Sequence, residues 1–297
     1  MDVQAVGRKH KQSRYELLQT MEPFVSTQLK LLPSIDTTWQ PSDILPLDLQ
    51  SLQTESDEFT ESLRAVSWET MVVIACNAIT EDALPSYSSA LRRVDVLREM
   101  PGDDISPWMQ WVRAWTAEEN RHGELLTRFL LLSGRIDGAG LERTTHSLIR
   151  NGFDTADDCD PIRTFIYTAF QERATKISHI NVAQLTQRAG ASLLAKICRL
   201  IAAEEARHEE IYTRFMKEIF MLDASEAVIA YSDMMRSRIS MPARLMGNIG
   251  GVDLFKQFSV IAENLGVYTS EDYISIIEHL NKRWGVANLK GLSSVCV

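Results

Sequence analysis

The sequence predicts an all-α protein, a four-helix bundle with additional flanking helices. Apolar residues recur at i, i+3, i+4 and i+7 over long stretches such as 108–132 and 192–222, which is the spacing of one buried helix face. No run alternates apolar and polar residues between hairpin dipeptides, so no strands are expected. Four of the helical segments run for about 25–33 residues, and helices of that length bury their apolar faces by packing side by side.

Clusters of glycine and proline delimit the helices. Such breaks fall, for example, at Pro41–Pro46, Pro101–Pro107 and Asn151–Pro161. We expect residues 1–14 to form a flexible basic tail and residues 15–297 to form one helical-bundle domain, because no linker or low-complexity tract divides them. The segments between the breaks predict helices near 15–31, 66–98, 107–133, 139–150, 161–188, 191–221, 225–238, 252–265 and 270–284.

The composition favours a soluble protein that does not bind nucleic acid. No apolar run approaches the roughly 18–20 residues that span a bilayer, and the charged N-terminus is not followed by an apolar segment typical of a signal peptide. The formal net charge of −9 argues against nucleic acid as a partner, although a local basic patch remains compatible with an acidic protein partner. The four cysteines show no C-x-x-C spacing, which favours free thiols in a reducing compartment.

Two of the long helical segments carry the same ionisable motif. Residues 117–122 read AEENRH and residues 203–208 read AEEARH. Each motif contains a glutamate and a histidine three residues apart, Glu119 with His122 in the first, so both side chains leave one helix face about one turn apart. The corresponding pair in the second motif is Glu205 and His208.

The other two long segments each contain a single carboxylate in an apolar neighbourhood. Glu81 follows Val72–Ala75 and Glu172 follows Phe165–Tyr167. The order along the chain is therefore Glu, Glu-x-x-His, Glu, Glu-x-x-His, with one element on each helix, which is the ligand set of ferritin-like di-iron and di-manganese proteins. Four carboxylates and two imidazoles suit iron, whereas zinc prefers fewer carboxylates. Two Fe(II) ions would also balance the four negative charges.

The spacing leaves two questions open. A lone Glu-x-x-His motif is weak evidence for metal, and only the repetition of the motif beside two buried carboxylates makes solvated helix faces a poor explanation. Glu118 and Glu204 stand four residues before their histidines, so they compete with Glu119 and Glu205 for the role of ligand. Spacing alone does not choose between these pairs.

Longer segments around these residues resemble the soluble plant-type acyl-acyl-carrier-protein desaturases. The resemblance is carried by Trp115–Gly123, Ile79–Pro85, Phe170–Thr175 and Asp233–Pro242. It extends over nearly the whole chain, from Trp39 to the Gly-Leu-Ser motif near the C-terminus. The resemblance implies an O₂-dependent enzyme that introduces a cis double bond into a saturated acyl chain carried by acyl carrier protein.

The family resemblance also implies a role for individual residues. It assigns one iron to Glu81 and His122 and the other to Glu172 and His208, with Glu119 and Glu205 bridging them. It assigns the active-site hydroxyl to Thr175 and electron entry to Trp39 and Glu204. It further implies two Fe ions that cycle between Fe²⁺ and Fe³⁺, O₂ as co-substrate, a ferredoxin-type electron donor and a homodimer. The compartment would be the bacterial cytoplasm or, in a plant, the plastid stroma.

Two further sets of residues are candidates for substrate and partner contacts. An acyl chain needs an apolar tunnel, because methylenes offer no polar handle, although ordinary core packing is the favoured explanation of each candidate residue. Acyl carrier protein is acidic, so its docking requires a local basic patch on this acidic chain. The tunnel candidates are Leu84, Ala90, Val94, Met109 and Phe165, and the docking candidates are Arg92, Arg93, Arg98, Arg236, Arg238 and Arg244.

Two other functions use similar ligands. A ferritin-like ferroxidase or iron-storage protein has a much shorter chain and no use for a separate route through Trp39. A ribonucleotide reductase small subunit needs a radical tyrosine near iron, and Tyr167 lies five residues from Glu172, off the ligand face. A catalytically silent scaffold is disfavoured because all six ligand positions are kept.

Overall fold

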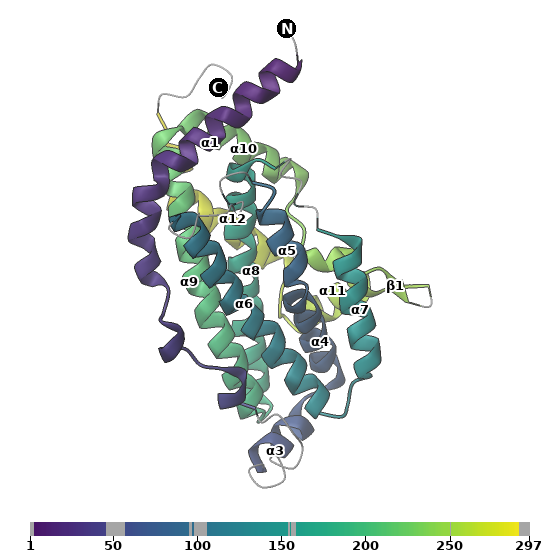
Figure 1. Ribbon diagram of the computed structural model, residues 1–297. Coiled ribbons are helices and arrows are strands. Elements are labelled where there is room, and N and C mark those ends of the chain that lie inside the picture. Colours follow the sequence, from purple (N-terminus) through teal and green to yellow (C-terminus); the bar gives the residue numbers. More distant parts are fainter. Residues whose placement is uncertain are drawn as a thin grey trace.

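The computed structural model describes residues 3–45, 57–94, 97, 106–153, 155, 159–249 and 251–290, with the side chains of residues 3–12, 57, 58 and 249 left out. The described chain is almost entirely helical (Figure 1). Its helices are α1 (Val3–Gln28), α3 (Asp57–Ala65), α4 (Trp68–Asp82), α5 (Leu84–Leu91), α6 (Pro107–Leu132), α7 (Gly138–Asn151), α8 (Pro161–Arg188), α9 (Ser192–Leu222), α10 (Ala224–Ser237), α11 (Leu254–Asn264) and α12 (Ser270–Trp284). Short 3₁₀ turns are η1 (Leu29–Leu31), η2 (Ile35–Thr37), η3 (Pro41–Asp43), η5 (Pro242–Leu245) and η6 (Val286–Asn288).

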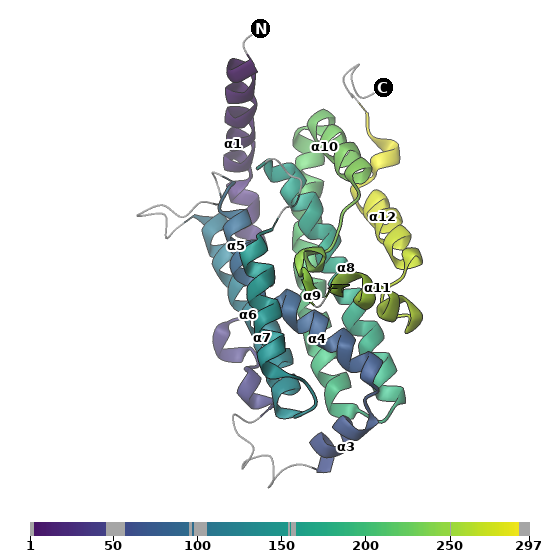
Figure 2. The same cartoon turned by 90° about the vertical axis from the view of Figure 1, so that its right-hand side faces the viewer.

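Four helices form the central bundle. Helix α8 packs along α9 and α4 packs along α6, while α6 also contacts α9. Helix α1 lies against α6 and α9, α10 and α12 lie against α8 and α9, and α7 and α11 lie against α4 (Figures 1 and 2). The predicted fold class, a four-helix bundle with flanking helices, is confirmed.

The helices begin where the sequence supplies a cap or a proline. The Asp160 carboxylate accepts a hydrogen bond from the Ile162 amide at 2.8 Å, and Pro161 occupies the first position of α8. The Ser67 hydroxyl accepts from the Thr70 amide at 3.2 Å at the start of α4. Each contact satisfies an amide that the helix itself leaves unpaired.

The predicted helix 66–98 is wrong as one element. It consists of α4 and α5, which meet at Ala83. Pro85 has no N–H to give to the Glu81 carbonyl four residues earlier, and its ring would clash with that carbonyl in a continuous helix. The Tyr87 hydroxyl donates to the Thr80 carbonyl at 2.6 Å, so a side chain binds a carbonyl near the break.

The first helix begins earlier than predicted. Helix α1 starts at Val3, whereas the sequence suggested a flexible tail up to residue 14. The side chain of Arg14 is buried, and its guanidinium contacts the carboxylates of Asp160 at 3.2 Å and Glu226 at 2.7 Å. Arg14 therefore joins α1 to the start of α8 and to α10 instead of being a solvated charge.

A small hairpin also departs from the prediction that no strands occur. β1 (Asn248–Ile249) pairs antiparallel with β2 (Val252–Asp253). Strands of two residues are too short to produce a period-two pattern. No helix in the described part of the chain has the length and apolar character to cross a membrane.

Buried apolar side chains form two clusters along the bundle. One contains Trp108 and Trp111 of α6 with Phe215 of α9, and the other contains Phe129 of α6 with Ile197 of α9. On both helices the buried ionisable residues lie in sequence between the two clusters. The bundle therefore holds a polar layer between two apolar ends.

Candidate metal centre

Six buried side chains from the four core helices meet in this polar layer. Two groups of potential ligand atoms form, each with all atoms within 4.8 Å of one another. Glu119 and Glu205 belong to both groups, which is the arrangement expected of two cations bridged by shared carboxylates. The remaining members are Glu81 and His122 in one group and Glu172 and His208 in the other.

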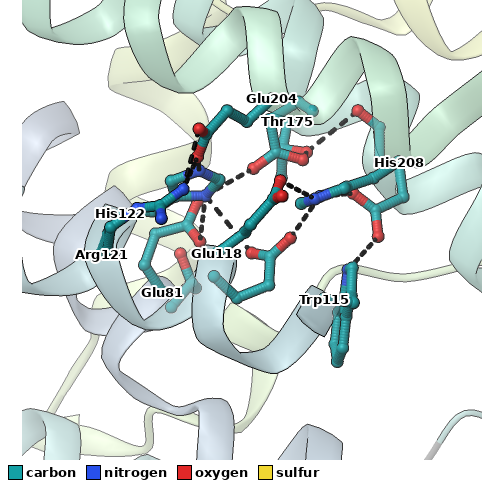
Figure 3. Close-up of polar contacts among 12 residues, drawn as sticks. Glu81, Trp115, Glu118, Arg121, His122, Thr175, Glu204 and His208 are labelled. Carbon is teal, nitrogen blue, oxygen red and sulfur yellow. Dashed lines mark hydrogen bonds and ion pairs between the residues drawn. The ribbon is translucent and has the colours of Figure 1, made fainter. Parts of the chain in front are cut away.

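The two histidines distinguish the competing glutamates. His122 turns Nδ1 toward the cluster, 3.2 Å from Glu205, and its Nε2 lies 3.0 Å from Glu204 (Figure 3). His208 likewise turns Nδ1 toward the cluster, and its Nε2 lies 2.9 Å from Glu118. Glu118 and Glu204 are therefore behind the imidazoles, and each binds the histidine of the opposite helix.

A close approach between helices allows this convergence. Gly123, one residue after His122, faces the backbone of α4, where a Cβ atom would lie 3.0 Å from the Asp82 amide nitrogen and 2.3 Å from its side-chain oxygen. A larger residue would push α6 away from α4 and carry Glu81 away from His122. The Thr127 hydroxyl also bonds to the Asp82 carboxylate at 2.5 Å and fixes the same contact.

Arginines hold the two outer glutamates. Arg121 Nη2 donates to both oxygens of Glu204 at 2.9 Å, and Arg207 Nη2 donates to Glu118 at 2.7 Å. The Trp39 ring is stacked 6.4 Å from the His122 ring, and the Arg121 guanidinium lies 4.9 Å from the Trp39 ring centre. Trp39 and Glu204, the pair predicted for electron entry, thus both contact Arg121.

Charges inside the cluster oppose one another. Burial raises the pKa of Glu81 and of Glu172 well above the ordinary value, and repulsion from neighbouring carboxylates raises it further. Burial also disfavours the charge of Glu119, but attraction from His122 and His208 outweighs it and lowers the pKa of Glu119. Burial disfavours imidazolium as well, yet the carboxylates raise the pKa of both histidines. Protons or cations must balance this negative layer.

The unpaired atoms fit cations better than they fit one another. Within the described residues, Oε1 of Glu119, Oε1 of Glu205 and Nδ1 of both His122 and His208 are buried and make no hydrogen bond, although His208 Nδ1 lies only 2.7 Å from Glu119 and His122 Nδ1 3.2 Å from Glu205. Buried polar atoms are normally paired, and all four of these point into the cluster. Hard oxygens combined with imidazole nitrogens suit iron or manganese. The residues present therefore fit a pair of such ions.

Thr175 lies beside the cluster. Its hydroxyl is 2.7 Å from Oε2 of Glu205, and it also approaches the carbonyls of Gln171 at 3.0 Å and Glu172 at 3.1 Å. A hydroxyl has one proton, so it donates to only one of these oxygens at a time. A small rotation exchanges the carboxylate for a backbone acceptor.

Two ring nitrogens face the carboxylates that are not shared. Trp115 Nε1 donates to Oε1 of Glu172 at 2.9 Å (Figure 3). His179 Nε2 lies 3.4 Å from Oε1 of Glu81, and burial lowers the pKa of His179 to about 4. His179 was not among the site residues predicted from the sequence. Its signal was a histidine seven residues after Glu172, on the same face of α8.

An apolar pocket with an empty volume of about 710 Å³, part of it open to solvent, runs along the cluster. Two threonines of α8 in its wall donate to their own helix, Thr164 to the Asp160 carbonyl at 3.0 Å and Thr168 to the Thr164 carbonyl at 2.9 Å. Their methyl groups are thus free to form the wall. The lining residues are Thr80, Glu81, Tyr87, Ala90, Leu91, Trp115, Glu119, Phe153, Thr155, Thr164, Tyr167, Thr168, Gln171, Glu172, Thr175, Glu205, Met241 and Pro242.

Only one of the five tunnel candidates lines this pocket. Ala90 does, whereas Leu84 lines a different pocket that also contacts Glu81. Val94, Met109 and Phe165 are buried in the apolar cluster around Trp108. Core packing therefore accounts for these three, as the sequence allowed.

The docking candidates are exposed where the structure describes them. Arg92 and Arg93 directly follow the pocket-lining residues Ala90 and Leu91, and Arg244 follows Pro242 by two residues. Arg98 lies outside the described residues. The second group, Arg236, Arg238 and Arg244, is exposed along the segment from the end of α10 to η5.

Comparison with known proteins gives a consistent result over nearly the whole chain. A family model described as fatty acid desaturase matches residues 13–296. Stearoyl-[acyl-carrier-protein] 9-desaturase 1, chloroplastic, of Arabidopsis thaliana is 42% identical over 310 residues, covering 99% of this chain and 79% of that protein. Palmitoyl-[acyl-carrier-protein] 4-desaturase 3, chloroplastic, of Ophrys sphegodes is 41% identical over 283 residues, covering 95% and 71%.

A solved structure shows the same fold. DesA2 from Mycobacterium tuberculosis H37Rv superposes with a TM-score of 0.61 at 18% identity, covering 93% of this chain and 97% of that chain. At such low identity the likeness concerns the fold alone. The two plant relatives are named for different acyl lengths and different bond positions, yet they match this chain almost equally, so overall identity does not select either property.

Proposed function

The chain belongs to the fatty acid desaturase family, and we propose that it introduces a cis double bond into a saturated acyl chain carried by acyl carrier protein. The observation that carries the proposal is the pocket: its lining is mostly apolar, and one side of it is formed by the buried carboxylate cluster. A saturated chain in this pocket has its methylenes beside the candidate metal centre. The reaction consumes O₂, two electrons and two protons, and it yields an alkene and two waters.

The proposed cofactor is a pair of iron ions. Glu81 and His122 would hold one ion, Glu172 and His208 would hold the other, and the two groups share Glu119 and Glu205. When bound, iron supplies the O₂ activation that removes hydrogen from unactivated methylenes and cycles between Fe²⁺ and Fe³⁺. Glu204 contacts Nε2 of His122, and Glu118 contacts Nε2 of His208, so each imidazole would be held with Nδ1 toward the ion.

The protein's own residues orient the chain and supply a proton. The apolar wall excludes water and confines the methylenes, so that the bend of the pocket selects which carbons react. Thr175 stands where the pocket meets Glu205, and its hydroxyl is placed to donate a proton to an oxygen atom at that boundary. Tyr167, the residue considered as a radical site, lines the pocket, and its hydroxyl donates to the Ser240 carbonyl at 2.9 Å.

The partners follow from the same surfaces. An acidic carrier protein would dock on the arginines beside the pocket, at Arg92 and Arg93. A ferredoxin-type donor would deliver electrons at Trp39, from which Arg121 and Glu204 lead to His122. We further propose a homodimer, to be tested by sedimentation mass, in a soluble compartment such as a plastid stroma or bacterial cytoplasm.

Oxygen uptake tests the proposed function. Iron-loaded protein, chemically reduced, should consume O₂ in the presence of stearoyl- or palmitoyl-carrier protein and form alkene in proportion. Replacing Glu119 or Glu205 with alanine should abolish both the paired iron and the product. Oxidation of added Fe²⁺ at full rate without acyl substrate, and with no alkene formed, would instead support a ferroxidase.

A further inference from the structure

The two carboxylates that are not shared between the metal groups have matching surroundings. Glu172 on α8 accepts a hydrogen bond from Trp115 on α6, at 2.9 Å. Glu81 on α4 faces His179 on α8, with 3.4 Å between Oε1 and Nε2. Besides the histidine of its own metal group, each carboxylate thus meets one further ring nitrogen from a neighbouring helix.

Three residues on one face of helix α8 take part in the cluster and its surroundings. Glu172, Thr175 and His179 are spaced at i, i+3 and i+7, which places them on one face of the helix. Glu172 belongs to the metal group, Thr175 reaches Glu205, and His179 reaches Glu81. Thr175 and His179 therefore contact different carboxylates of the cluster.

The surroundings of His179 determine which nitrogen carries its hydrogen. The side chain is 1% exposed, and its Nδ1 has no hydrogen-bond partner among the described residues. A neutral imidazole has one N–H and one acceptor nitrogen. Placing the hydrogen on Nε2 gives it to Glu81, whereas placing it on Nδ1 would leave a buried donor unpaired and, with Glu81 ionised as a metal ligand must be, two acceptors facing each other.

From this geometry we infer that His179 is a positioning residue, which donates Nε2–H to Glu81 and fixes that carboxylate as a ligand of the iron shared with His122. The inference rests on the proposed di-iron function. Trp115 performs the same task for Glu172. Because each donor serves a different carboxylate, loss of either donor should loosen one iron and leave the other as it was.

His179→Phe tests the role, because it keeps a ring and removes the donor. One of the two irons should pass to a ferrous chelator roughly 10- to 100-fold faster, as is typical when a partner of a metal ligand is lost. In ⁵⁷Fe Mössbauer spectra one quadrupole doublet should change and the other should not. His179→Gln, whose amide N–H reaches about as far as Nε2, should restore the release rate and the spectrum.

Mirror and control variants separate this role from packing. Trp115→Phe should also accelerate release of one iron, and the double variant with His179→Phe should release both quickly. His146, exposed on α7, provides the matched control, and His146→Phe should release iron at the wild-type rate.

Three results would overturn the inference. The first is wild-type iron release from His179→Phe, and the second is equal acceleration of both irons with a lowered melting temperature, which indicates a packing role. The third is failure of His179→Gln to restore iron retention. A wild-type protein that does not hold two irons would overturn the proposed function as well, and this outcome is recognised before any variant is compared.

Discussion

Glu204 and Glu118 occupy equivalent places behind the two histidines, but their replacement should have unequal costs. Each accepts a contact from one imidazole Nε2, at 3.0 Å for His122 and 2.9 Å for His208. Glu204→Gln and Glu118→Gln keep the shape of the side chain and remove its charge. The histidine contribution is therefore similar in the two variants, and the arginine behind each glutamate decides the difference.

The exposure of that arginine sets the magnitude. Arg121 is 8% exposed and holds both oxygens of Glu204, so the variant leaves a cation in the interior without a counter-charge. Breaking a buried pair in this way costs about 3–5 kcal/mol. Arg207 is 33% exposed and can turn to water, so its pair with Glu118 contributes only about 0–1 kcal/mol. Glu204→Gln should thus be less stable than Glu118→Gln by roughly 2–5 kcal/mol.

Urea unfolding of chelator-treated protein measures this difference without a contribution from iron binding. In thermal unfolding, at about 2–4 °C per kcal/mol for a chain of this order, the melting temperatures should differ by roughly 4–20 °C. Glu124→Gln, on the exposed side of α6 beside Arg128, is the matched control and should change stability by less than about 0.5 kcal/mol. Equal losses for the two variants, or a larger loss for Glu118→Gln, would refute the reasoning.

Three further outcomes are expected. Iron affinity should rise with pH, because the raised pKa values of His122 and His208 mean that protons must leave before the imidazoles can bind metal. Competition with a chelator between pH 6 and 8 measures this affinity, and an affinity independent of pH would contradict the prediction. Thr175→Val should keep iron content and melting temperature but lower the alkene formed per O₂ consumed, and an unchanged ratio would remove the assigned role. Arg92→Glu with Arg93→Glu should raise KM for acyl carrier substrate about tenfold with little change in kcat, as added salt should also do; a KM indifferent to both argues against docking there.

The long helices and the position of the carboxylates could be predicted from the sequence because both depend on local spacing. In a Glu-x-x-His motif on a helix, the glutamate and the histidine lie about one turn apart whatever the tertiary structure. Glu119 with His122, and Glu205 with His208, therefore lie on the predicted faces. The role of Glu118 could not be read from spacing, since it depends on the opposite helix, whose His208 it contacts.

The pocket and the helix break depend on contacts between distant segments. Phe165 and Ala90 are both buried and apolar, so hydrophobicity could not show that only Ala90 lines the pocket. Pro85 was a visible signal for the break between α4 and α5, because proline removes a helix hydrogen bond. His179 was overlooked because its partner, Glu81, lies 98 residues away along the chain.

The measurement that tests the central claim most directly is mass spectrometry of the products formed from a panel of acyl-carrier-protein substrates by the iron-loaded, reduced protein with O₂. The pocket against the carboxylate cluster predicts loss of two hydrogens from the acyl chain, with one cis double bond at a single position and a preference for one chain length. Unchanged acyl chains throughout the panel, or equal conversion of free fatty acids, would contradict it.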